Sequence, residues 1–143
     1  MLSVCKVIRT NKLAHTSEFL FVICLTLTSQ KRYNQKMITS LTNAKVKYVR
    51  RLQTDRRFRN REMQYVVEGT RWLTELIGLA HPPALLFYTE RWLETAVHAQ
   101  ILQQLTSLGQ STPFITTEEV MQAMSDTSNP AGVLAVIAMQ PRP

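Results

Sequence analysis

From Met37 onward, the hydrophobic and polar positions follow helical and strand-like patterns in turn. The segment 40–53, SLTNAKVKYVRRLQ, has apolar residues at helical spacing: Val46, Tyr48, Val49 and Leu52. This spacing predicts an amphipathic helix with Lys47, Arg50 and Arg51 on its outer face. Thr42 or Asn43 is expected to cap its first turn. The following stretch, 54–62, has no clear apolar stripe, so we predict that it frays into a loop.

Beyond residue 62, four strand-like runs alternate with three helical patterns. The runs MQYVVEG, ALLFYT, TPFIT and GVLAVIAM are rich in β-branched and aromatic residues or continuously apolar, as buried strands are. The first helical pattern, 70–80, gives a core face of Trp72, Leu73, Leu76, Ile77 and Ala80. The second pattern, 91–109, is expected to be one long helix that ends at Gly109, with a stripe of Leu93, Val97, Ile101, Leu105 and Leu108. The third pattern, 117–126, is a short helix capped by Thr116 or Thr117.

Strands that alternate with helices predict a mostly parallel sheet with helices on both faces. The expected fold class is therefore α/β, a single three-layer α/β/α sandwich over residues 37–141. Both tryptophans, Trp72 and Trp92, lie among apolar residues at helical spacing, so we expect them in the core.

The first 36 residues differ from this patterned region. They contain an apolar run, EFLFVICLTLT, which is too short to span a bilayer and which follows Lys6, Arg9 and Lys12 like a signal peptide. No small-residue cleavage site follows it. Three interpretations stand: a start assigned too early, with Met37 as the true one; a signal or surface anchor; or an extra strand or helix. The favoured one is the early start, which makes residues 1–36 dispensable for the fold.

Charge is concentrated in one short segment. The 143 residues include 17 Lys or Arg against 10 Asp or Glu, a net charge of +7. Eight of the cations lie in KVKYVRRLQTDRRFRNRE, beside only two acids: Lys45, Lys47, Arg50, Arg51, Arg56, Arg57, Arg59 and Arg61. Arginine grips phosphate with a planar fork of donors, and Tyr48 and Phe58 offer faces on which bases could stack. The segment predicts a nucleic-acid site, although a solvated basic face without a ligand remains the alternative.

Catalytic and metal-binding motifs are missing from the sequence. It contains no GxGxxG, P-loop, HExxH, GxSxG or CxxC motif, and its three histidines and two cysteines are scattered. We therefore predict no catalytic or metal-ligating residue in this chain. Glu68, with Gly69 after it, follows a predicted strand, where α/β folds tend to bind ligands. Glu68 could shape such a site, but the favoured interpretation is structural: its carboxylate accepts backbone N–H groups at the start of the next helix.

Two motifs together indicate a family. The first is an opening Asn-x-Lys-x-Lys motif, formed by Asn43, Lys45 and Lys47. It is followed by an Arg-Arg-Leu element, a basic stretch and a predicted strand that ends at Glu68 and Gly69. The later FYTE and SDTSNPAGVLAV provide the closing element. This order resembles the N-terminal substrate-binding domain of the SpoU/TrmH family of RNA ribose 2′-O-methyltransferases, over Met37 to about Pro141. The chain departs from the family pattern at Ala131, where Gln is common, and at Tyr65, where Phe is common.

The resemblance implies more than the spacing shows. It implies a fold similar to that of kink-turn-binding ribosomal proteins, and a domain that presents rRNA or tRNA to a separate, knotted catalytic domain in the cytoplasm. S-adenosylmethionine would bind that second domain, so no cofactor is expected in this chain, which would be inactive in methyl transfer alone. Two other classes stay open. One is a stand-alone structural RNA-binding protein of the kink-turn type. The other is a basic protein of the membrane surface that uses residues 1–36 together with the basic stretch.

Overall fold

The computed structural model describes residues 37–109 and 113–140. Four strands form one sheet in the order β1-β4-β2-β3. Their bounds are β1 Gln64–Glu68, β2 Leu85–Thr89, β3 Pro113–Thr116 and β4 Val133–Ala138. The strands β2 and β4 lie in the centre, and their residues are almost all buried, as continuous apolar runs predict. Ile38 adds a single parallel bridge to Thr116 at the β3 edge.

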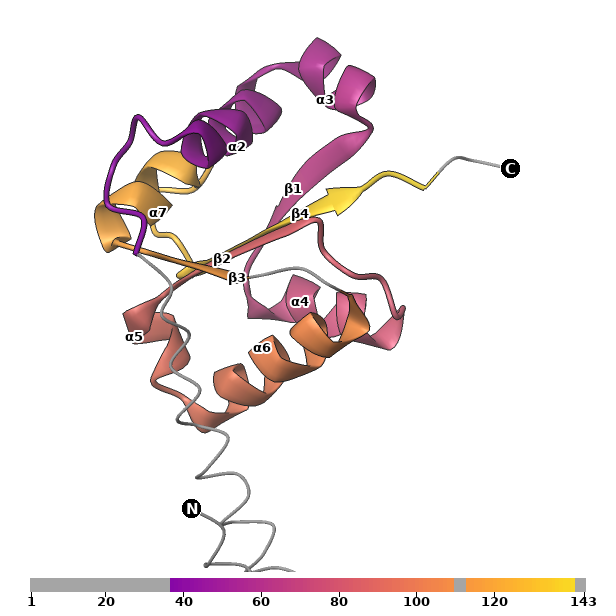
Figure 1. Ribbon diagram of the computed structural model, residues 1–143, viewed down its shortest axis with the longest axis vertical. Helices are drawn as coiled ribbons and strands as arrows, with labels where there is room; N and C mark the ends of the chain where they lie inside the picture. The colour runs from indigo at the N-terminus through magenta and orange to yellow at the C-terminus, as the bar shows by residue number, and fades with distance from the viewer. Residues whose placement is uncertain (1–36, 110–112, 141–143) are drawn as a thin grey trace, which may run out of the picture. The chain divides into compact units, whose positions relative to one another are not determined.

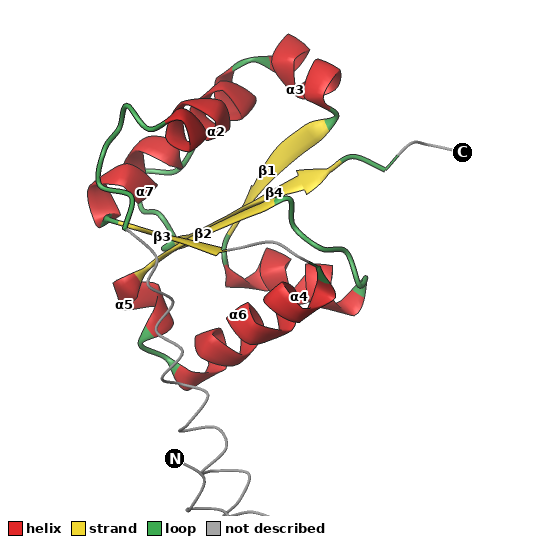
Figure 2. Cartoon of the chain, viewed as in Figure 1, coloured by secondary structure: helices red, strands yellow, loops and turns green. Residues whose placement is uncertain are grey.

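Helices cover both faces of this sheet, which confirms the α/β class and the three layers (Figures 1 and 2). One face carries α2 Ala44–Thr54, α3 Arg56–Glu62 and α7 Glu118–Met124. The other face carries α4 Thr70–Gly78, α5 Glu90–Leu93 and α6 Ala96–Leu108. Each face has its own apolar cluster, because the side chains of β4 alternate between the two. Val49 and Leu134 belong to the first cluster, and Leu105 and Val133 belong to the second.

The sheet is mixed, so the expectation of a mostly parallel sheet was wrong. β4 runs antiparallel to both β1 and β2, and only β2 and β3 are parallel. The physical reason lies in α7, which has seven residues and is only about 10 Å long. A parallel crossover needs a connection that returns along the whole sheet. Here the chain leaves α7, stays at the carboxyl end of β1 and enters β4 from that side, where Gly69 N–H donates to the Val133 carbonyl.

Three local predictions also differ from the structure. Residues 56–62 form the helix α3 instead of a loop, because Asp55 caps it and Phe58 anchors it in the core. The pattern 91–109 is two helices, broken at Glu94 and Thr95. Trp72 is 57% exposed and Val97 is 58% exposed, so neither belongs to the core. By contrast Trp92 is buried as expected, and its indole N–H donates to the Thr70 hydroxyl at 2.9 Å.

Several other predictions are confirmed. Val46, Val49 and Leu52 form the buried face of α2, and Asn43 caps this helix by accepting from Lys45 N at 2.9 Å. Thr117 caps α7, and Gly109 follows the last residue of α6. The interpretations of residues 1–36 concern positions outside the described residues and stay predictions.

Candidate nucleic-acid interface

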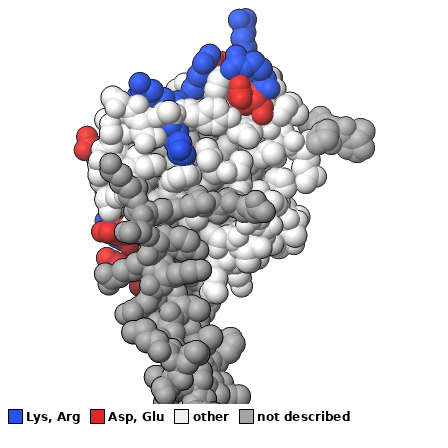
Figure 3. All heavy atoms as spheres, in the orientation of Figure 1, with Lys and Arg blue, Asp and Glu red and all other residues white. Residues whose placement is uncertain are grey.

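The outer face of α2 carries a row of cations. Lys47, Arg50 and Arg51 are exposed and recur at three- and four-residue spacing, so they lie on one side of the helix. The opposite side is the buried one that packs on the sheet. Figure 3 shows the Lys and Arg side chains gathered at the top of the molecule, where α2 and α3 lie. We call this surface, formed by the eight cations of residues 45–61, the basic surface.

Asp55 joins the two helices of the basic surface. It ends α2, where its backbone N–H donates to the Arg51 carbonyl oxygen, and it caps α3 by accepting from Phe58 N at 3.0 Å. This backbone hydrogen bond is the main cause that holds the pKa of the Asp55 carboxyl below its ordinary value. Its carboxylate also lies 3.6 Å from the Arg51 guanidinium. One acid therefore fixes the angle at which the two basic helices meet.

Phe58 is buried under two of the cations. The guanidinium carbons of Arg51 and Arg61 lie 4.2 Å and 4.9 Å from the centre of its ring. Tyr48 packs edge-on against the same ring, with 5.4 Å between the ring centres, and its hydroxyl donates to the Gln64 side chain. The two aromatic rings were expected to offer stacking faces to bases. In the structure the Phe58 ring is instead core that supports Arg51 and Arg61.

Arg59 has a structural role that the sequence did not indicate. Its Nη1 donates to the carbonyl oxygens of Leu52 at 2.7 Å and Gln53 at 2.8 Å. These carbonyls belong to the last turn of α2, where intrahelical donors run out. A cation at this end of a helix is also favoured by the helix dipole. Arg59 therefore supports the fold at the end of α2, a role that its charge alone did not indicate.

Four cations of the basic surface have side chains without a partner among the described residues. Within residues 37–109 and 113–140, no ion pair or side-chain hydrogen bond is formed by Lys47, Arg50, Arg56 or Arg57. The rest of the described chain has the opposite balance, since residues 63–140 hold seven acids and two arginines, Arg71 and Arg91. Among the described residues, the positive charge is therefore concentrated on α2 and α3.

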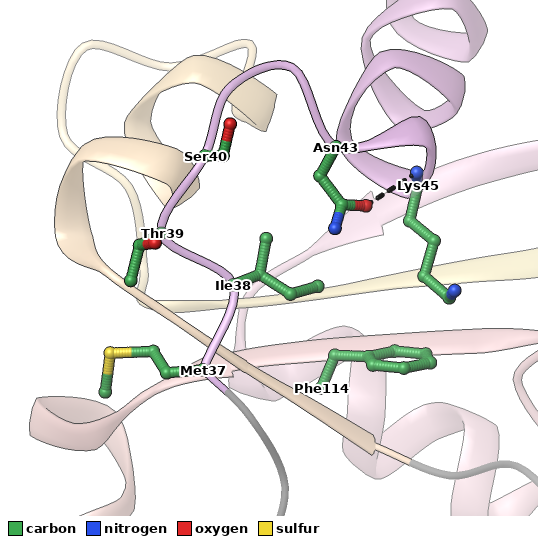
Figure 4. A pocket seen from close by; sticks show the side chains of 7 residues that line it. All are labelled: Met37, Ile38, Thr39, Ser40, Asn43, Lys45 and Phe114. Atoms are coloured by element: carbon green, nitrogen blue, oxygen red, sulfur yellow. Dashed lines mark hydrogen bonds between the residues drawn. The ribbon is translucent and has the colours of Figure 1, made fainter.

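A pocket of about 460 Å³ opens beside the first turn of α2 (Figure 4). Its lining comes from the segment before α2, from α2 itself and from β3: Met37, Ile38, Thr39, Ser40, Asn43, Lys45 and Phe114. Lys45 Nζ lies 5.0 Å above the centre of the Phe114 ring. The charge pattern predicted Lys45 as a binding residue, but it did not predict the pocket. No local pattern indicates that Ile38 pairs with β3 and so brings these segments together.

Glu68 is a structural residue, but the expectation that it accepts backbone N–H groups at the start of the next helix is wrong. Its carboxylate accepts from Ser125 Oγ at 2.6 Å, Thr127 Oγ1 at 3.3 Å and Ala131 N at 3.0 Å. These donors lie in the loop that leads into β4, not at the start of α4. Gly69 has a φ of 99° and precedes α4 without a side-chain cap. Glu68 therefore holds the closing SDTSNPAG loop to the carboxyl end of β1, and Gly69 N–H donates to the Val133 carbonyl at the start of β4.

The described residues contain neither a cluster of metal ligands nor a membrane-spanning helix. No group of three or more His, Cys, Asp or Glu side chains within them is placed to hold a metal ion. In the same part of the chain, no helix combines the length and the apolar character that crossing a bilayer requires.

Comparison with known proteins gives a domain family. The model of the MRM3-like substrate binding domain matches residues 43–135, which is well over half of the chain. The chain belongs to this family of substrate-binding domains, and the resemblance predicted from the sequence is confirmed. A comparison with curated protein sequences finds no match.

The solved structures with the same fold include RNA methyltransferases. An rRNA methyltransferase from Sinorhizobium meliloti matches with a TM-score of 0.62 and 23% identity, over 73% of this chain and 37% of its own. An RNA 2′-O ribose methyltransferase matches with a TM-score of 0.57 and 24% identity, over 76% of this chain and 39% of its own. A putative TrmH-family RNA methyltransferase from Porphyromonas gingivalis matches with a TM-score of 0.55 and 21% identity, over 73% of this chain and 38% of its own. The 143 residues thus span less than two fifths of each neighbour. The likeness to kink-turn-binding proteins stays a prediction.

Proposed function

We propose that this domain binds structured RNA through the basic surface on α2 and α3 and presents it for ribose 2′-O-methylation. The observation that carries the proposal is the set of exposed cations without partners on α2 and α3, Lys47, Arg50, Arg56 and Arg57. Cations that are not neutralised by the protein are available to phosphates, and each one that contacts a phosphate releases counterions. Membership of a substrate-binding family supports RNA as the polyanion.

The finer parts of the proposal follow from the resemblance. The RNA is rRNA or tRNA, the compartment is the cytoplasm, and the methyl donor, S-adenosylmethionine, binds a catalytic domain and not these residues. A relevant neighbour is an rRNA methyltransferase from Sinorhizobium meliloti that was solved with this cofactor bound. The described residues of this chain contribute RNA contacts, and the cations do not need to touch the reacting ribose for this role.

A pair of double variants with equal charge change tests the proposal. Arg56→Ala with Arg57→Ala removes two cations from the basic surface, whereas Arg71→Ala with Arg91→Ala removes two exposed cations from α4 and α5. In a fluorescence anisotropy titration with a structured rRNA fragment, the first variant should bind about ten-fold more weakly or worse. The second should bind like the unaltered protein. Equal weakening by both variants would show that net charge, and not this surface, drives binding.

A further inference from the structure

The pocket beside the first turn of α2 points to a second kind of RNA contact. We propose that it receives one unpaired nucleobase, which stacks on Phe114 while the adjoining phosphates lie along the basic surface. This inference rests on the proposed RNA binding and makes it more specific, because phosphate contacts position the RNA but do not read its bases.

The pocket has the chemistry of a base-binding site. In Figure 4 the ring of Phe114 lies below Lys45, and Ile38 adds an apolar wall, while the Met37 side chain lines the pocket but points away from the ring. The Phe114 ring is held from below, since it lies 5.5 Å from the buried Phe87 ring. The half-buried ring has the Lys45 ammonium over it, and an aromatic ring from which such a lysine withdraws is a platform on which bases stack in single-strand-binding proteins. A volume of about 460 Å³ is within the range of small-ligand pockets.

Two polar groups at the pocket are donors, beside the hydroxyls of Thr39 and Ser40. Asn43 Oδ1 accepts from Lys45 N, so the Asn43 amide is oriented with its NH₂ group toward the pocket (Figure 4). Lys45 Nζ lies over the Phe114 ring from the same side. Among the described residues neither donor has an acceptor, and none of the seven lining residues is acidic. Two donors beside an aromatic ring fit a base that offers carbonyl oxygens, and they would disfavour a cationic ligand.

Entry of a base requires that Lys45 leave the ring, and this displacement costs little. An exposed cation–π contact is weak, and the flexible lysine stem can carry the ammonium to a neighbouring phosphate. The pocket and the far end of α2 are about 16 Å apart along an 11-residue helix. A strand with its base in the pocket can therefore continue past Lys47 and Arg50 toward α3.

Two RNAs and two variants test the subsite. The RNAs are a hairpin with a loop of unpaired uridines and a blunt duplex with the same number of phosphates. Phe114→Leu removes the ring but keeps an apolar side chain against Phe87. The matched control is Trp72→Leu, which removes an exposed aromatic ring from α4 on the other face of the sheet. Melting temperatures are compared first, so that loss of the fold is not taken for loss of binding.

The expected result is selective. Phe114→Leu should weaken hairpin binding by roughly five-fold to a hundred-fold, as loss of one stacked base does, and should leave duplex binding unchanged. Trp72→Leu should change neither. If Phe114→Leu binds the hairpin like the unaltered protein, or weakens both RNAs equally while folded, the subsite is wrong but the basic surface stands. If the unaltered protein binds neither RNA at low salt, both proposals fail.

Photocrosslinking covers the case in which Phe114→Leu does not fold. The unaltered protein is irradiated with the uridine-loop hairpin, and the modified peptide is sequenced by mass spectrometry. A uridine adduct on Phe114 supports the subsite. Adducts that map elsewhere, with none on Phe114, would overturn it.

Discussion

Arg59 Nη1 lies 2.7 Å from the Leu52 carbonyl oxygen, so an arginine of the basic surface closes the last turn of the helix before it. Arg57, two residues earlier on the same short helix, is exposed and has no side-chain partner in the described part of the chain. Neighbouring arginines in one cluster thus have different roles, one in folding and the other free for a ligand.

This difference predicts opposite outcomes for two similar substitutions. Arg59→Ala should lower the free energy of unfolding by about 1–2 kcal/mol, because two carbonyls at the end of α2 lose a charged donor. Arg57→Ala should change it by less than about 0.5 kcal/mol, as surface substitutions usually do, and weaken RNA binding instead. Urea denaturation and anisotropy titrations of both variants measure the two effects. Equal stability of the two variants would contradict the helix-closing role of Arg59.

Glu68 should matter for stability and not for RNA affinity. Glu68→Ala removes the carboxylate that accepts from Ser125 Oγ and leaves Ala131 N without its acceptor, which frees the loop before β4. We expect a loss of roughly 1–3 kcal/mol in the free energy of unfolding, with RNA affinity unchanged. Glu75→Ala, at an exposed carboxylate on α4, is the matched control and should be neutral. A large drop in RNA affinity at constant stability would assign Glu68 to the binding site.

Two glycines should respond in opposite directions to alanine. Gly132 has a φ of +77°, and a Cβ there would lie 3.0 Å from Thr89 Oγ1 and 3.1 Å from Trp92 Cβ. Gly132→Ala should therefore cost roughly 1–3 kcal/mol of stability. Gly78 is at the end of α4 with nothing within 4 Å of its added Cβ, so Gly78→Ala should raise stability by roughly 0.5–1 kcal/mol. Differential scanning calorimetry of both variants distinguishes these signs.

Because Asp55 caps α3, the stability of the protein should depend on pH in the acidic range. Since its pKa is lowered in the folded state, its contribution to stability is complete above the unfolded pKa of about 3.9 and is lost as the pH falls through the lower folded value. The melting temperature should thus fall less steeply below about pH 4 in Asp55→Asn, whose amide can cap but does not titrate there. Asp126→Asn should keep the steep fall, because the Asp126 carboxylate accepts no hydrogen bond within the described residues. Identical acid profiles for Asp55→Asn and the unaltered protein would contradict this role of the cap.

Hydrophobic spacing predicted the helices whose buried residues recur every three or four positions. The buried face of α2 follows directly from Val46, Val49 and Leu52. The helix α3 was missed because seven residues with one apolar anchor make no stripe. The sequence did contain a signal, since Asp55 stands three residues before Phe58, the spacing of a helix cap. Trp72 shows the opposite error, because its apolar neighbours at helical spacing do not determine how far the core extends around α4.

Sequence alone could not give the features that depend on tertiary contacts. The direction of β4 is decided by where the loop after α7 is held, and Glu68 holds it from a strand 57 residues away. The pocket requires Ile38 beside β3, a single bridge without a sequence pattern. Charge clustering located the basic surface, but it could not tell Arg57 from Arg59, because that distinction depends on which carbonyls lie within reach of each guanidinium.

The salt dependence of RNA binding tests the central claim most directly. Anisotropy titrations of a structured rRNA fragment at several salt concentrations give the slope of log affinity against log salt. If four to six cations of the basic surface contact phosphates, the slope should be on the order of −3 to −5. Arg56→Ala with Arg57→Ala should make it less negative by about two, and Arg71→Ala with Arg91→Ala should leave it unchanged. A slope near zero, or the same slope in all three proteins, would contradict an RNA interface on α2 and α3.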